Sequence, residues 1–247
     1  MKVRDLADVR RRTLLKAAGA AAALSALPLA GRVVAAEGPR MKIGMIGSGN
    51  VGSNLGRVWA KAGHEVMFSS RDIENDKKLA AEVGSKARAG TPQQAAAFGE
   101  VLTFAVPYGA LPELGKSLGS SLKGKVVIDA CNPFPARDGD IANTAREKGA
   151  GVVSAELLPG ARIVRAFNAV GARRMGTAHE EAGKIGMPIA GDDKQAIEIA
   201  SRLIREIGYE PVLIGGLNMG KYLMPGTPLA GERSPDEIRK IAATLTP

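Results

Sequence analysis

The sequence predicts a single α/β domain with a doubly wound, mostly parallel sheet and helices on both faces. Short apolar runs alternate with helical stretches between residues 42 and 214, as in parallel sheets covered on both sides. The first apolar run breaks into a glycine-rich turn and then continues as a helix. Residues 37–247, which follow an N-terminal leader, are numerous enough for one such domain and require no second one.

Residues 1–36 have the layout of a secretory leader. Three arginines at 10–12 precede Thr-Leu-Leu-Lys, and residues 17–30 are almost wholly alanine, leucine and glycine, which resembles a twin-arginine signal peptide. The small residues at 34–36 predict cleavage near Ala36, and hence a periplasmic or otherwise exported protein that the twin-arginine translocase carries. The apolar run is shorter than the ~20 residues that span a bilayer. The alternatives are an uncleaved anchor or an amphipathic cytosolic arm.

The charge and the cysteine content exclude several classes of function. The net charge is +9, but the leader holds seven basic and two acidic residues, so residues 37–247 carry only +4. That excess is too small to indicate nucleic-acid binding. One cysteine, Cys131, excludes an internal disulfide, and two histidines predict no metal centre. We expect Cys131 to be a packed residue, and His64 to be a solvated turn residue.

The first strand, at 42–46, leads into a Gly-x-Gly-x-x-Gly motif formed by Gly47, Gly49 and Gly52. In a Rossmann-type fold the first glycine permits a tight turn, the second permits close approach of a pyrophosphate, and the third permits close packing of the helix. The phosphates lie at the helix N-terminus, where free N–H groups and the helix dipole favour an anion. The motif therefore predicts a dinucleotide site.

The second strand, at 64–68, ends in Ser69-Ser70-Arg71, at about the spacing where an NAD-binding fold places its ribose-binding acid. No acid stands at that position. Ser70 and Arg71 suit a 2′-phosphate, because a guanidinium offers a planar fork of donors to phosphate oxygens. This favours NADP over NAD. The alternative is that Asp72 binds the ribose diol, which would reverse the preference.

Further strands are predicted at 101–106, 125–130, 162–167, 188–191 and 209–214, with a helix from about Ala110 and an amphipathic helix at 194–207. Asp192 or Asp193 is the expected N-cap of the second helix.

Ligands of open α/β sheets lie beyond the carboxyl ends of the strands. Three segments should therefore line the crevice where the nicotinamide rests: 106–108, 132–134 and 167–169. The alternative is that Pro107 and Pro133 only end strands and that Asn168 caps a helix.

Several separated motifs resemble the coenzyme F420-dependent NADP oxidoreductases, to which the cytosolic domains of six-transmembrane metalloreductases are also similar. These motifs are 46–52, 69–71, 105–107, 129–133, 164–168 and 214–217. The resemblance implies that Ser48, Asn50 and Val51 contact the pyrophosphate, and that Val106 and Pro107 contact the nicotinamide ribose. It places the second ligand against Asn132, Pro133, Phe167 and Asn168, and it implies a homodimer.

The resemblance implies direct hydride transfer, in which the protein supplies orientation more than acid–base chemistry. The expected function is an exported NADP-dependent oxidoreductase that acts on a small-molecule redox acceptor: a deazaflavin such as coenzyme F420, a flavin, a metal chelate, or a small carbonyl or imine. The alternatives are a nucleotide-binding protein without turnover, and a membrane-tethered electron-transfer component like the metalloreductase domains.

Overall fold

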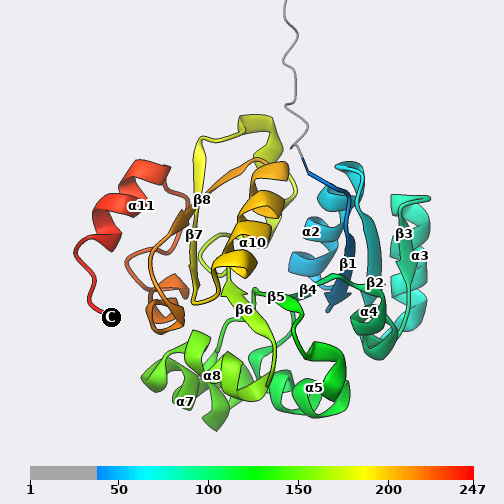
Figure 1. The fold of residues 1–247 in the computed structure, drawn as a ribbon, viewed down its shortest axis with the longest axis horizontal. Helices are drawn as coiled ribbons and strands as arrows, with labels where there is room; N and C mark the ends of the chain where they lie inside the picture. Colours follow the sequence, from blue (N-terminus) through cyan, green and yellow to red (C-terminus); the bar gives the residue numbers. More distant parts are fainter. Residues whose placement is uncertain (1–37) are drawn as a thin grey trace, which may run out of the picture. The chain divides into compact units, whose positions relative to one another are not determined.

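A computed structural model describes residues 38–247, so the expected leader and its cleavage site lie outside the described residues. The described part contains one eight-stranded sheet, in the order β3-β2-β1-β4-β5-β6-β7-β8 (Figure 1). The strands are β1 (Lys42–Ile46), β2 (Glu65–Ser69), β3 (Ala87–Ala89), β4 (Val101–Phe104), β5 (Val126–Asp129), β6 (Arg162–Arg165), β7 (Ile185–Gly191) and β8 (Tyr209–Leu213). All neighbouring strands are parallel except β6 and β7. The predicted fold class is confirmed.

The helices are α2 (Asn50–Lys61), α3 (Ile73–Val83), α4 (Pro92–Phe98), α5 (Leu111–Leu118), α6 (Pro135–Asp138), α7 (Asp140–Lys148), α8 (Ala150–Leu157), α9 (Ala172–Met175), α10 (Lys194–Glu206) and α11 (Pro235–Ala242). Asp193, and not Asp192, caps α10, because its carboxylate accepts the N–H of Ala196 at 2.8 Å. Within residues 38–247, no helix has the length and apolar character needed to cross a membrane.

Helices cover both faces of the sheet (Figure 1). One core cluster joins the sheet to α2, α3 and α10, and a second joins its other face to α4, α5, α7 and α8. Trp59 of α2 ties the first layer together, since its indole N–H donates to the carbonyl oxygen of Leu203 in α10 at 2.9 Å. A third, smaller cluster lies between β7, β8, α11 and the 3-10 helix at Leu217–Leu223.

The strand order reverses between β1 and β4, which are hydrogen-bonded neighbours. Ile46 at the end of β1 lies beside Phe104 at the end of β4, and the chain leaves the two strands for helices on opposite faces. Such a switch point opens a crevice beyond the carboxyl ends of the strands.

Candidate functional site: the glycine loop and the strand ends

The first and third glycines of the loop are required by the protein itself. Gly47 has φ +103°, and a Cβ there would lie 2.4 Å from the carbonyl oxygen of Ala105 beyond β4. A Cβ at Gly52 would lie 1.9 Å from the carbonyl oxygen of Gly47. Any side chain at either position would force the strand, turn and helix apart.

Gly49 differs from the other two because, apart from its own chain neighbours, no protein atom lies within 4 Å of the position its Cβ would take. It caps α2 without a side-chain hydrogen bond, and the first turn of α2 holds no acidic residue. The first N–H groups of a helix have no partner within the helix. This end of α2 therefore offers backbone donors, a favourable dipole and open space to an anion.

A cavity of about 910 Å³ extends from the glycine loop. Its wall contains the ends of β1 and β2, the segment that follows β4, and residues of α3, α4 and α5. The lining residues are Ile46, Gly47, Ser48, Gly49, Ser69, Ser70, Arg71, Asp72, Asn75, Pro92, Gln93, Ala105, Val106, Pro107, Gly109, Ala110, Glu113, Leu114 and Ser117. The structure thus brings together the loop residues Gly47 to Gly49 with Ser70, Arg71, Val106 and Pro107, all of which the sequence placed at the nucleotide.

Beyond β2, the carboxylate of Asp72 is engaged by its own helix. Its Oδ1 accepts the backbone N–H of Asn75 at 3.1 Å and its Oδ2 accepts the Asn75 side-chain amide at 2.7 Å, so Asp72 is the N-cap of α3. Arg71 and Asp72 are both exposed and both line the cavity, but only Asp72 has its charged group engaged by α3. This arrangement favours Arg71 over Asp72 as the charged group that contacts the adenosine ribose.

Asp76 of α3, which the sequence analysis did not single out, lies beneath this part of the cavity. Its side chain is fully buried, and it accepts hydrogen bonds from the hydroxyls of Ser48 and Ser70, the latter at 2.9 Å. The sequence does hold a signal for it. Asp76 precedes Leu79 and Ala80 by three and four residues, and so lies on the buried face of α3.

The ends of β5 and β6 meet through two asparagines. The side-chain amide of Asn132 donates to the carbonyl oxygen of Asn168 at 2.9 Å, and the amide of Asn168 donates to the carbonyl oxygen of Cys131 at 3.2 Å. The Oδ1 atoms of both asparagines are buried without a hydrogen-bond partner in residues 38–247. Neither asparagine lines the 910 Å³ cavity, and nor does Pro133, which is buried.

Phe167 is placed differently from what the resemblance implied. Its ring is buried in the core, edge-on to Trp59 at 6.0 Å and to Tyr209 at 6.1 Å between centroids. Its backbone adopts φ +67°, the left-handed region, which is uncommon outside glycine. Because the ring is buried in the core and does not line the cavity, we leave it out of the site proposed below.

A buried ion pair lies behind the asparagines. Arg165 donates to Asp129 at 2.6 Å, and Asp129 also accepts the backbone N–H of Cys131 at 2.9 Å. Burial, reinforced by Asp129, raises the pKa of the Cys131 thiol well above its usual range, and the same two causes raise the pKa of Tyr108. Both groups remain protonated at neutral pH. Cys131 is packed, as expected, and its thiol contacts the carbonyl oxygen of Phe104.

The prediction for His64 is wrong. Its side chain is fully buried, its Nδ1 accepts the N–H of Met41 at 3.0 Å, and its Nε2 pairs with Glu206 of α10. It joins the start of β1 to the end of α10. No group of three or more metal-ligating side chains occurs between residues 38 and 247.

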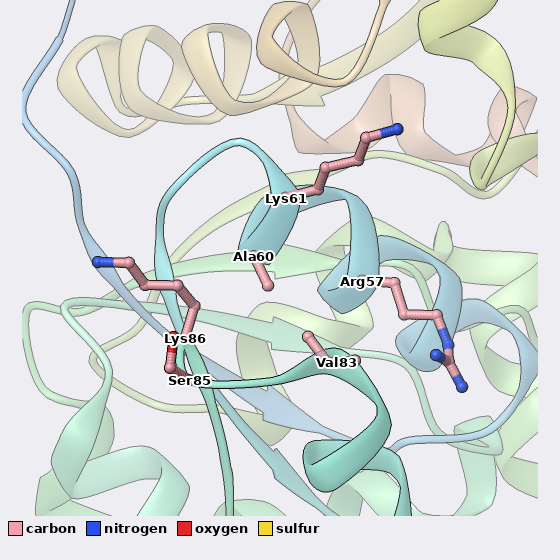
Figure 2. A pocket seen from close by; sticks show the side chains of 6 residues that line it. All are labelled: Arg57, Ala60, Lys61, Val83, Ser85 and Lys86. Atoms are coloured by element: carbon pink, nitrogen blue, oxygen red, sulfur yellow. The ribbon is translucent and has the colours of Figure 1, made fainter.

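A smaller concave region lies at the other end of α2, lined by Arg57, Ala60, Lys61, Val83, Ser85 and Lys86. Figure 2 shows that its three cationic side chains point away from one another. They do not converge on a common point where an anion would sit.

Comparisons with known proteins agree with this geometry. The family model for NADP oxidoreductase, coenzyme F420-dependent, matches residues 42–133. The F420-dependent NADP reductase of Methanothermobacter thermautotrophicus is 30% identical over 206 residues, covering 76% of this chain and 87% of that protein. The enzyme of the same name from Methanothermobacter marburgensis is 30% identical over 208 residues, covering 76% and 90%.

Solved structures show the same fold. A hypothetical protein from Sinorhizobium meliloti matches with a TM-score of 0.64 at 24% identity, over 78% of this chain and 93% of that one. A structure assigned as an F420-dependent NADP-reductase, from Arthrobacter sp. FB24, matches with a TM-score of 0.65 at 22% identity, over 73% and 87%.

The fold, the glycine-loop cavity and these relatives together define a nucleotide-binding oxidoreductase of the Rossmann type. Within that class, the chain belongs to the coenzyme F420-dependent NADP oxidoreductase family.

Proposed function

We propose that this protein transfers a hydride between NADP(H) and coenzyme F420. The observation that carries the proposal is the cavity at the switch point of the sheet, into which Gly49 and the N-terminus of α2 open. The two Methanothermobacter relatives are F420-dependent NADP reductases, and both align over most of their length.

The cavity residues fit the parts of a dinucleotide in order. Ser48 and Arg71 line the cavity, whereas Asn50 and Val51 do not. In this proposal Ser48 and the backbone N–H groups of Asn50 and Val51 at the start of α2 bind the pyrophosphate, while Arg71 supplies the cation for the 2′-phosphate. Val106 and Pro107, beyond β4, hold the nicotinamide ribose. When bound, the nicotinamide carries the hydride, and the protein's part is to hold the two rings in contact and exclude water.

The second ligand lies against Asn132, Pro133 and Asn168 in this proposal. Both asparagines stand at carboxyl ends of parallel strands, on the same edge of the sheet as the nucleotide cavity. Their unpaired Oδ1 atoms are hydrogen-bond acceptors, and a buried acceptor without a partner costs free energy. A ligand that donates to them would remove that cost, and to reach them it would have to displace the atoms that cover them in this structure.

Binding and turnover are measured separately on the full chain stripped of nucleotide. Calorimetric titration with NADPH and with NADH tests the nucleotide site, and loss of the deazaflavin absorption on adding NADPH and F420 tests hydride transfer. We expect tight NADPH binding and reduction of F420. Folded protein that binds neither nucleotide would overturn the proposal. NADPH binding without any hydride transfer to F420 would favour the non-catalytic alternative.

We also propose export through the twin-arginine route, with cleavage near Ala36. This rests on the sequence alone, namely on the arginines at 10–12 and the alanine-rich run after them. The mass of the native protein tests it, since a mature N-terminus at Glu37 is expected. An intact N-terminus would contradict cleavage.

A further inference from the structure

A single buried carboxylate, that of Asp76, links two parts of the cavity wall: the glycine loop and the segment that follows β2. Asp76 has no exposed surface, and its two oxygens accept hydrogen bonds from Ser48 in the glycine loop and from Ser70 beyond β2. Both serines line the cavity, whereas Asp76 does not. Asp76 can therefore affect a ligand only through these two hydroxyls and through its charge.

We infer that Asp76 is a positioning residue that weakens discrimination between NADPH and NADH, because it makes Ser70 a poor ligand for a 2′-phosphate. The inference rests on the proposed nucleotide site. Selectivity for NADPH then depends on Arg71, and not on the Ser70 hydroxyl that the sequence placed beside it.

The reason is the number of protons on a hydroxyl group. Each serine hydroxyl carries one proton to donate, and an ionised carboxylate can only accept. The Ser70 hydroxyl has two acceptors within the protein, Asp76 Oδ2 at 2.9 Å and the carbonyl oxygen of Asp72 at 3.3 Å, and its Oγ already accepts the N–H of Asp72 at 3.1 Å. Because the proton is directed into the protein, the serine Oγ atoms offer lone pairs, and not a donor, to a ligand in the cavity.

A ribose 2′-hydroxyl can donate to such lone pairs, but a phosphate dianion cannot. Phosphate oxygens need donors, and the negative charge of Asp76 beneath the serines repels them further. The start of α3 stabilises the carboxylate in this position, because Asp76 lies in its first turn, near the positive end of the helix dipole.

The test is Asp76→Asn in the full chain stripped of nucleotide, with the dissociation constants of NADPH and NADH measured by calorimetry. The asparagine amide donates to one serine, which frees that hydroxyl proton for the ligand, and the negative charge is lost. We expect NADPH to bind about tenfold more tightly and NADH to change less than about twofold, as for one gained hydrogen bond to a charged group.

Glu74→Gln is the matched control: it removes an exposed charge from the same turn of α3 without touching either serine. We expect it to leave the ratio of the two constants unchanged.

An unchanged ratio in Asp76→Asn, or equal weakening of both nucleotides, would show that Asp76 is only structural and would overturn the inference. Native protein that binds neither nucleotide would instead overturn the proposed function. If Asp76→Asn does not fold, Ser70→Ala decides the question. The inference expects the ratio in Ser70→Ala to stay within about twofold of the native value, whereas a selective tenfold loss of NADPH affinity, typical of a lost charged hydrogen bond, would contradict it.

Discussion

The guanidinium of Arg165 at the end of β6 donates to the carboxylate of Asp129 at the end of β5 at 2.6 Å, and neither side chain is exposed. Asp129→Asn would leave a buried cation without its counter-ion. We expect it to lower the free energy of unfolding by about 3 to 5 kcal/mol, the usual cost of breaking a buried pair from one side.

Urea unfolding at pH 7 measures this effect. The matched control is Glu82→Gln, which breaks the exposed pair with Arg57 and should cost less than about 1 kcal/mol. Similar small costs for the two variants would show that the Asp129 carboxylate is not needed to balance Arg165.

Arg71→Ala should weaken NADPH binding by about 1.5 to 3 kcal/mol, as for a lost charged hydrogen bond, and barely affect NADH. Arg57→Ala is the control, because Arg57 is an exposed arginine of α2 that lies in the other concave region (Figure 2). Calorimetric titration of both variants with both nucleotides gives the comparison. Equal losses for NADPH and NADH in Arg71→Ala would mean that Arg71 does not contact the 2′-phosphate.

Gly49→Ala and Gly52→Ala should separate binding from folding. Gly49→Ala places a methyl group where no protein atom lies within 4 Å, so we expect native stability but a loss of affinity for both nucleotides of at least about tenfold, or 1.4 kcal/mol. In Gly52→Ala the new Cβ would lie 1.9 Å from the carbonyl oxygen of Gly47, and overpacking should cost about 1 to 3 kcal/mol of stability. Thermal unfolding and titration of each variant test both expectations. Unchanged affinity in Gly49→Ala would argue against a pyrophosphate at this turn.

Cys131 should report unfolding of this domain. Burial and Asp129 raise its pKa, so the thiolate that reacts with disulfide reagents is scarce as well as inaccessible. We expect no reaction with an aromatic disulfide at pH 8 in buffer, and stoichiometric reaction in denaturing urea. Fast labelling of the native protein would show that the ends of β4 and β5 open readily.

Asp193 should contribute to stability in a pH-dependent way. Its hydrogen bonds to Arg162 and to the N–H of Ala196 lower its pKa to about 2. Because the folded-state pKa lies below the unfolded value of about 3.9, the contribution is complete above that value and is lost as the pH falls toward 2. Asp193→Asn should therefore reduce the urea midpoint equally at pH 7 and pH 5, and by less at pH 3. A difference that is independent of pH would show that the charge of Asp193 does not matter.

Much of the fold could be predicted because the strands are buried on both faces and appear as continuous apolar runs. The short strand β3 was missed, since three residues, Ala-Arg-Ala, carry no such signal. The fourth strand was predicted to 106 but ends at Phe104, where the chain turns away before Pro107. Apolar composition continues past that turn and does not mark it.

The nucleotide loop could be predicted because it is local in sequence, whereas its supporting contacts are not. His64 is buried against Glu206 and Met41, and Glu206 is distant in the sequence. The Phe167 ring packs against Trp59 and Tyr209, and its backbone lies in the left-handed region; hydrophobic periodicity reveals neither. Asp76 accepts hydrogen bonds from Ser48 in the glycine loop and Ser70 after β2, and only the folded structure brings these residues together.

The three glycines of the loop are needed for different reasons, two for packing of the protein and one for the ligand. Gly47 and Gly52 are required wherever this strand, turn and helix pack together, whether or not a nucleotide ever binds. A related protein that no longer bound the cofactor would still need both residues. Its sequence would therefore retain two of the three glycines of the nucleotide-binding motif. Only Gly49 could be substituted without disturbing the packing once nucleotide binding is lost. The residue at this position therefore distinguishes a related protein that binds the nucleotide from one that no longer does.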